Sequence, residues 1–402
     1  NLAAYEVYLQ ATDLLLTAQY LTGREQGSKL NDARRLLEGA LELDSCFADA
    51  YASLGSIYIN DLFLRRIRNN AEIANSTLES GLAFVEKALQ YDPGNSAALQ
   101  LKGSYYQRTG NHEEAKKYVE ASFKNRTRTY GDYEWEAISY LEYDNFYPGI
   151  KSYLKYLELK QPYMDVPANL LHEVYRAFMG TGFFELARQQ AEKHLALTRD
   201  YDQYYWRMSM LERWQGNHYA AQEYTLKRWE LDNSSRAYLR WSMSNYIYLN
   251  ELDSAYKYMQ LLEVERRKEG QNLSPDFFYG WIYLDRGQKS EADYHLQGFI
   301  SRQKIKLELK TPNSQKGYTH ALLGIAYSIL GDGPNTLKHI EYLKEVSALD
   351  IGWIYDLKYF SSFDFVRNTS EFQSVLKHME KAYRKEHKKI ARLLRKENYP
   401  AS

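Results

Sequence analysis

A short signature recurs along this chain at a nearly constant interval, and this recurrence limits the folds open to the chain. Thr109–Phe123 reads TGNHEEAKKYVEASF, and Gln215–Trp229 repeats its glycine, asparagine, histidine and alanine in the same order as QGNHYAAQEYTLKRW. A turn residue followed five positions later by a small residue occurs repeatedly, at intervals of about 34 to 44 residues. These pairs are Gly110–Ala115, Asp144–Gly149, Gly182–Ala187, Gly216–Ala221, Asn250–Ala255, Gly287–Ala292 and Gly331–Thr336. A period of this length predicts a row of two-helix units.

Each residue of the signature has a place in such a unit. The turn residue ends the first helix in a left-handed conformation, which costs glycine little. Asn111 and Asn217 are expected to cap the second helix. His112 and His218 follow one residue later, and we expect both side chains to be solvated at the start of that helix.

Small residues are expected where the two helices of a unit approach most closely, because a larger side chain there would hold the backbones apart. Two first helices depart from this rule, since Tyr175 and Met243 stand where a small residue is expected. The residues predicted to serve this packing are Gly55, Gly103, Ala115, Ala187, Ala221, Ala255, Gly280, Ala292 and Gly324.

These units resemble the tetratricopeptide repeat (TPR), with its consensus W-x2-L-G-x2-Y, A-x3-F and a following proline. Ala50–Tyr58 (AYASLGSIY) carries the first part of this pattern, and Asp92-Pro93 ends a helix where the family has its proline. The resemblance covers nearly the whole chain and implies an all-α fold, a right-handed α-α superhelix (solenoid). We expect about nine TPR-like helix pairs over residues 1–347, followed by C-terminal capping helices and a basic tail over 348–402. The second unit is lengthened by an insertion within residues 62–76, which begins with Leu62–Asn70.

A second resemblance lies near the two ends of the chain. Phe360–Glu380 (FSSFDFVRNTSEFQSVLKHME) is similar to the ending of a bacterial group of TPR proteins, and Asn1–Ala11 is similar to their opening. Ser361 and Asn368-Thr369 replace prolines and an acidic residue of that ending. In that group, which includes membrane-tethered transcription regulators and adenylate cyclases, the TPR half commonly follows a signalling domain. The resemblance implies a periplasmic location, with the cytoplasm as the alternative, and we expect the chain to be a processed or excised portion of a longer one.

Composition excludes several classes of protein. Lys and Arg number 52 and Asp and Glu also number 52, so the chain lacks the one-signed charge excess of a dedicated nucleic-acid-binding or membrane-surface protein. A single cysteine, Cys46, allows no disulfide within the chain and no cysteine-based metal site. No run of residues approaches the ~18 apolar residues needed to span a bilayer.

The sequence contains no recognisable catalytic pattern. The 9 histidines are dispersed, and His172-Glu173 lacks the second histidine of a zinc-protease motif. Gly180–Glu185 (GTGFFE) has two glycines of a dinucleotide fingerprint, but it reads better as the turn between two helices of a repeat. There is no Gly-rich phosphate loop and no G-x-S-x-G elbow. We therefore expect no enzymatic activity, no cofactor and no metal.

The first helices of such an array line its concave side. Tryptophan, tyrosine and arginine dominate the energetic centres of protein interfaces, and several of them fall on these helices at the centre of the chain. The residues predicted to line a partner-binding groove are Arg176, Trp206, Met210, Arg213, Trp214, Arg240, Tyr248, Phe277 and Trp281. The alternative for each is a place in the core between helices, and packing is also the expected role of most of the 38 tyrosines.

The sequence thus predicts a non-enzymatic scaffold that binds a protein or peptide segment in this groove. The second resemblance implies that this scaffold is the sensing or docking half of a larger signalling protein. One alternative is a small-ligand sensor that binds a metabolite in the same groove, and another is a self-assembly module. No nucleic acid is expected as a partner. The basic segment Lys377–Glu397 is expected to cap the array, with weak contact to a membrane or an acidic partner as its alternative role.

Overall fold

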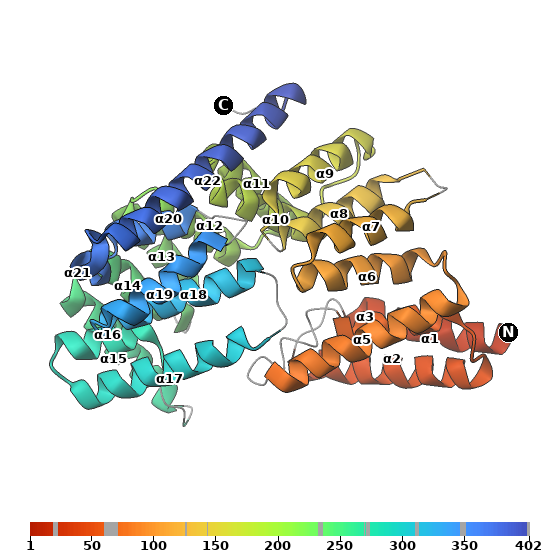
Figure 1. Ribbon diagram of the computed structural model, residues 1–402, viewed down its shortest axis with the longest axis horizontal. Coiled ribbons are helices and arrows are strands. Elements are labelled where there is room, and N and C mark those ends of the chain that lie inside the picture. Colours follow the sequence, from red (N-terminus) through yellow and green to blue (C-terminus); the bar gives the residue numbers. More distant parts are fainter. Residues whose placement is uncertain are drawn as a thin grey trace. The chain divides into compact units, whose positions relative to one another are not determined.

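The computed structural model describes residues 1–18, 23–59, 71–124, 127–142, 144–231, 236–268, 270, 274–309, 313–345 and 351–399. Every regular element within these ranges is a helix, so the predicted all-α class is confirmed (Figure 1). Of the insertion predicted within residues 62–76, residues 62–70 lie outside the described residues, and residues 71–76 form the start of a helix.

The helices follow one another as antiparallel pairs, and the described part of the chain holds nine such pairs, as predicted. The pairs are α1 (Leu2–Ala18) with α2 (Gly23–Leu43), α3 (Ala48–Ile59) with α5 (Ala71–Tyr91), α6 (Ser96–Arg108) with α7 (His112–Ser122), α8 (Tyr130–Leu141) with α9 (Phe146–Leu159), α10 (Ala168–Gly180) with α11 (Phe184–Thr198), α12 (Tyr201–Trp214) with α13 (His218–Leu231), α14 (Arg236–Tyr248) with α15 (Leu252–Lys268), α16 (Phe277–Asp285) with α17 (Lys289–Leu307), and α18 (Asn313–Ile329) with α19 (Gly333–Glu341). The C-terminal elements are the 3-10 helix η1 (Tyr342–Glu345), α20 (Ile351–Tyr359), the 3-10 helix η2 (Ser361–Phe363), α21 (Asp364–Arg367) and α22 (Ser370–Lys396).

The turns within the pairs have the conformation that the repeat signature predicts. All of the predicted turn residues are left-handed, with φ between 57° and 86°: Gly110, Asp144, Gly182, Gly216, Asn250, Gly287 and Gly331. The side chain of Asn111 caps α7 by accepting a hydrogen bond from the backbone N–H of Glu114, at 3.3 Å. A left-handed turn residue therefore separates the two helices of these pairs, and in α7 a side-chain cap also fixes where the second helix begins.

The residues predicted to allow close packing all lie at buried positions in the helix pairs. A Cβ atom added to Gly280 would lie 2.4 Å from Cγ of Leu296 on the partner helix. The same atom on Gly55 would lie 2.6 Å from Cγ2 of Val85. Glycine at these two positions is thus what lets α3 approach α5 and α16 approach α17.

The contacts divide the chain into two compact units. Unit 1 comprises residues 1–128 and 305–312, and unit 2 comprises residues 129–304 and 313–402. The core of unit 1 is built from apolar side chains of its successive helix pairs, such as Leu37, Leu54 and Val85. The division predicted from sequence periodicity, between 1–347 and 348–402, stays a prediction.

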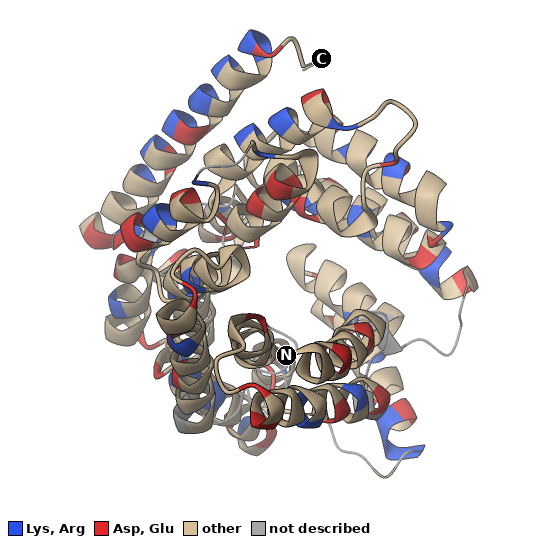
Figure 2. Ribbon diagram, turned by 90° about the vertical axis from the view of Figure 1, so that its right-hand side faces the viewer, with Lys and Arg blue, Asp and Glu red and all other residues tan. Residues whose placement is uncertain are grey.

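Helix α22 belongs to the core of unit 2. It packs against α9, α19 and α20 (Figure 1), and its Ile390, Leu393 and Leu394 join the same apolar cluster as side chains from α8 to α12. Lysines and arginines recur along the exposed side of this helix (Figure 2). The helix pairs of unit 2 therefore cover the apolar side of this amphipathic, basic helix.

Candidate binding cavity

Unit 2 contains a cavity of about 360 Å³ that is lined mainly by first helices of the pairs. Arg176 comes from α10, and Met210, Arg213 and Trp214 come from α12. The wall continues through α14, α16 and α18 and is completed by η1 and α20. The other lining residues are Asp144, Arg240, Trp241, Ser244, Tyr248, Phe277, Phe278, Gly317, Tyr318, Leu322, Ile325, Leu343, Gly352, Trp353 and Asp356.

The cavity brings together most of the residues predicted to line a groove: Arg176, Met210, Arg213, Trp214, Arg240, Tyr248 and Phe277. Two others lie elsewhere. Trp206 stacks on His172, with 6.4 Å between ring centroids. Trp281 packs edge-on against Phe360, at 4.8 Å between centroids. That any of these residues binds a partner stays a prediction.

Arg213 is the most unusual of the lining residues, because the residue is 5% exposed and no carboxylate of the described residues lies within ion-pair distance of it. One terminal nitrogen donates to Oγ of Ser244 at 3.2 Å, and the other donates to Oδ1 of Asn245. Its Nε has no hydrogen-bond partner among the described residues. The rings of Trp241 and Tyr248 lie 5.0 and 5.1 Å from the guanidinium carbon, so aromatic faces replace a counter-charge.

A buried network of neutral side chains holds Asn245, and through it Arg213, in place. Nδ2 of Asn245 donates to Oε1 of Gln222 at 3.0 Å and to Oγ1 of Thr225 at 3.2 Å. The amide of Gln222 in turn donates to Oγ of Ser242 at 3.1 Å. Buried networks of this kind are costly unless their members are satisfied, and when satisfied they fix orientation. The orientation of the guanidinium is therefore set by α13 and α14 before any ligand arrives.

The other two arginines of the cavity are already paired with carboxylates. Arg176 forms ion pairs with Asp144 at 2.9 Å and with Glu173 at 2.7 Å. Arg240 pairs with Asp276 at 2.7 Å. Burial raises the pKa of Asp144, and the neighbouring Arg176 opposes that shift. The contrast leaves Arg213 as the described cavity cation that has no carboxylate of its own.

Helix α20 closes one side of the cavity. The hydroxyl of Tyr248 donates to Oδ1 of Asp356 at 2.8 Å. The hydroxyl of Tyr355 and Nε2 of His218 are 2.6 Å apart. Burial raises the pKa of Asp356 to about 7, although the bond from Tyr248 and the charge of Arg213 both favour the ionised carboxylate. The chain's own residues thus cover part of the surface that the sequence predicts to be open.

The prediction that His218 is solvated is wrong. The residue is 7% exposed, and its ring stacks on Tyr248 at 5.2 Å between centroids and contacts Tyr355. Burial, together with the charge of Arg213, lowers the pKa of His218 to about 4. Its partner Tyr355 lies 137 residues further along the chain, so the local repeat pattern could not show this contact. The side chain of the equivalent His112 lies outside the described residues.

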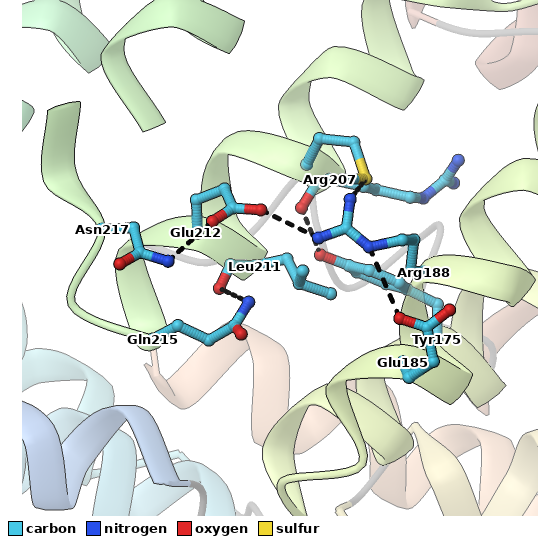
Figure 3. A network of polar contacts seen from close by, with 9 residues as sticks. Tyr175, Glu185, Arg188, Arg207, Leu211, Glu212, Gln215 and Asn217 are labelled. Carbon is cyan, nitrogen blue, oxygen red and sulfur yellow. Dashed lines mark hydrogen bonds and ion pairs between the residues drawn. The ribbon is translucent and has the colours of Figure 1, made fainter. Parts of the chain in front are cut away.

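A second polar network joins α10, α11 and α12 (Figure 3). Arg188 donates to Glu212 at 2.9 Å, and the other carboxylate oxygen of Glu212 accepts from Nδ2 of Asn217 at 2.9 Å. The prediction that Asn217 caps α13 is therefore not met, because its side chain is directed to this carboxylate. Tyr175, which replaces a small residue, is fully buried, and its hydroxyl donates to the backbone oxygen of Arg207 at 2.7 Å (Figure 3).

Sequence reasoning missed several residues of the cavity wall. Trp241 and Phe278 are adjacent to predicted residues, and a broader stripe along the first helices would have included them. Trp353 and Asp356 lie in the C-terminal segment, where the repeat periodicity is lost. No signal in the sequence places that segment against α12 and α14.

The described residues hold no group of three or more His, Cys, Asp or Glu side chains that could bind a metal ion. Within the same ranges, no helix is both long enough and apolar enough to cross a bilayer.

Among known proteins, the chain is similar to several solved structures. No protein-family model and no curated protein sequence matches the chain. The type IV pilus biogenesis factor PilW is 16% identical, with a TM-score of 0.41 over 54% of this chain and 92% of PilW. A tetratricopeptide repeat protein from Parabacteroides merdae is 14% identical, with a TM-score of 0.41 over 77% of this chain and 98% of that protein. YrrB, described as a TPR protein with an unusual peptide-binding site, is 15% identical, with a TM-score of 0.33 over 49% of this chain and 92% of YrrB. The TPR-type fold of this chain itself rests on the helix pairs, turns and small-residue contacts described above.

Proposed function

We propose that the chain is a non-enzymatic binding module and that the cavity of unit 2 takes an anchoring group from a protein or peptide partner. The observation that carries this proposal is the wall of the cavity. Its aromatic side chains and preset guanidinium come from the first helices of successive pairs. Rigid aromatic and arginine side chains that surround a partly enclosed space are the usual energetic centre of a recognition surface.

The resemblance of both ends of the chain to bacterial TPR regulators supports a more specific role. We propose that the module is the sensing or docking half of a larger, membrane-tethered signalling protein and that it lies in the periplasm, with the cytoplasm as the alternative. The exposed basic side of α22 (Figure 2) could add weak contact with an anionic membrane or an acidic partner, since its apolar side is occupied by unit 2. Nucleic acid is not proposed as a partner of this region, because the balanced charge of the chain does not favour it.

Selection of peptides from a random display library on the purified chain tests the binding proposal. We expect selected peptides to bind with dissociation constants of about 1–100 μM and to lose at least about tenfold in affinity on Trp214→Ala. Trp206→Ala is the matched control, because Trp206 lies on the same helix and is similarly half-buried but does not line the cavity. Circular dichroism checks that both variants keep their helices. Peptides that bind the Trp214 variant as well as the wild type would overturn the proposal.

A small-ligand sensor is the second candidate, and one observation favours it. Gly352, Trp353 and Asp356 of α20 form part of the cavity wall, so the space is bounded by the chain itself. Its volume lies at the lower end of the roughly 300–1,000 Å³ of small-molecule sites. Saturable binding of a small molecule that fills the cavity, without any selected peptide, would favour this candidate.

A further inference from the structure

We propose that the cavity of unit 2 binds an organic monocarboxylate with a flat apolar body, and that Arg213 holds the carboxylate group. The inference rests on the proposal that this cavity is a binding site, and it adds the chemical class of the group that enters it.

The first step is the unused hydrogen-bonding capacity of Arg213. A guanidinium has five N–H donors in one plane, which match the two oxygens of a carboxylate. Arg213 donates one hydrogen bond to Ser244 and one to Asn245, and its buried Nε has no partner among the described residues. A buried cation without a hydrogen-bonded counter-charge is costly, and an anion bound in the cavity that Arg213 lines would reduce this cost.

Second, no described carboxylate around the cavity forms an ion pair with Arg213. Asp356 lines the same cavity, but it accepts its hydrogen bond from Tyr248 and is not within ion-pair distance of Arg213. Asp144 and Asp276 are occupied by Arg176 and Arg240. The described carboxylates around the cavity therefore have partners other than Arg213, and a ligand carboxylate would supply the hydrogen-bonded anion that this guanidinium lacks.

The third step is the shape and polarity of the remaining wall. Trp214, Trp241 and Trp353 line the cavity together with further aromatic and aliphatic side chains, Tyr318, Phe277, Phe278, Leu322, Ile325 and Leu343. Indole and phenyl faces favour a flat apolar body.

Isothermal titration calorimetry on the full chain tests this proposal with three matched series of probes. Benzoate, phenylacetate, 1-naphthoate and indole-3-acetate form the acid series, and their primary amides and the corresponding primary amines form the two others. We expect at least one acid to bind about tenfold or more tightly than its amide and its amine, because only the carboxylate supplies the charge that Arg213 lacks. A short peptide ending in phenylalanine, with a free or an amidated C-terminus, distinguishes a peptide carboxylate from a free acid.

Two arginine variants locate the binding. Arg213→Gln is expected to weaken binding of the selected acid at least about tenfold. Arg207→Gln is the matched control, since Arg207 is equally buried on α12 and has no carboxylate at ion-pair distance among the described residues, but it contacts His172 and does not line the cavity. If Arg213→Gln does not fold, Met210→Trp replaces it, because a larger side chain at this lining position reduces the space in the cavity while Arg213, Ser244 and Asn245 are left unchanged.

The possible outcomes separate the chemical class from the function. Acid binding that is lost in Arg213→Gln or Met210→Trp and kept in Arg207→Gln supports the proposal. Amides or amines that bind as well as the acids would overturn the carboxylate class while leaving the cavity as a binding site. Failure of all three series and of both peptides would overturn the cavity as a site for this chemistry, and peptide selection tests the broader function separately.

Discussion

Asp356 is a carboxyl group that the fold favours in its protonated form. It lies against the cavity with Tyr248 as its hydrogen-bond donor, and burial raises its pKa to about 7. An aspartate in an unfolded chain is ionised above pH ~4. Between these two values the folded protein therefore holds one proton more than the unfolded chain, so the stability contributed by this group is complete below pH ~4 and is lost as the pH rises through ~7.

Asp356→Asn should remove this loss, because asparagine keeps an acceptor for Tyr248 and does not ionise. We expect the free energy of unfolding of the variant, relative to wild type, to rise between pH 5 and pH 8. The rise is limited to about 1.4 kcal/mol for each unit of the pKa shift and is reduced by solvent in the cavity. Urea unfolding at several pH values measures it, and the exposed Asp293→Asn serves as the control. A constant difference between variant and wild type across this range would contradict the prediction.

For single residues, the sequence predicted conformations that depend on neighbours in the chain. It missed burial and contacts that depend on residues far away in the sequence. The left-handed turns at Gly110 and Asn250 were predictable because the need for such a residue arises within one helix pair. The burial of His218 and the position of Asp356 were not, because both result from α20 packing against helices more than a hundred residues earlier. Arg213 was identified as a surface residue of a groove, whereas its fixed orientation depends on Gln222 and Asn245 of two other helices.

The helix pair is the element whose geometry the sequence determines most directly. In α3 and α5, a Cβ atom on Gly55 would lie 2.6 Å from Cγ2 of Val85 and 3.1 Å from the backbone oxygen of Gly81. Val85 is fully buried, and the Gly81 oxygen belongs to a helix, so neither can move away freely. The close approach of the two helices at this point therefore requires the absence of a side chain.

Gly55→Ala should consequently destabilise unit 1 by about 1–3 kcal/mol, because the clash exceeds the gain in helix propensity. Gly39→Ala is the matched control, since Gly39 lies inside α2 and a Cβ atom there meets nothing within 4 Å. The control should stabilise the protein by up to about 1 kcal/mol through propensity alone. Urea unfolding followed by circular dichroism compares the two, and equal effects of both substitutions would show that Gly55 is not at a close helix contact.

For the molecule as a whole, the two units differ in how their contacts are distributed along the sequence. In unit 1, helices such as α1, α2 and α3 pack mainly on their sequence neighbours, as in a one-dimensional repeat array. In unit 2, α22 packs against both α9 and α19, and it places Ile390 and Leu394 in a cluster with side chains from α8 to α12. The C-terminal helix therefore links repeats that are far apart in sequence, which the loss of periodicity in this segment could not reveal.

This difference predicts how the two units open. Leu394 is fully buried, so Leu394→Ala should cost about 2–5 kcal/mol and speed amide hydrogen exchange in α9, α10 and α11 as well as in α22. Exchange in α1–α3 should remain at its wild-type rate, because these helices belong to unit 1. Arg392→Ala on the exposed side of α22 is the control and should leave exchange unchanged. Hydrogen exchange followed by mass spectrometry resolves these segments, and faster exchange confined to α22 would mean that the helix merely covers unit 2 without linking its repeats.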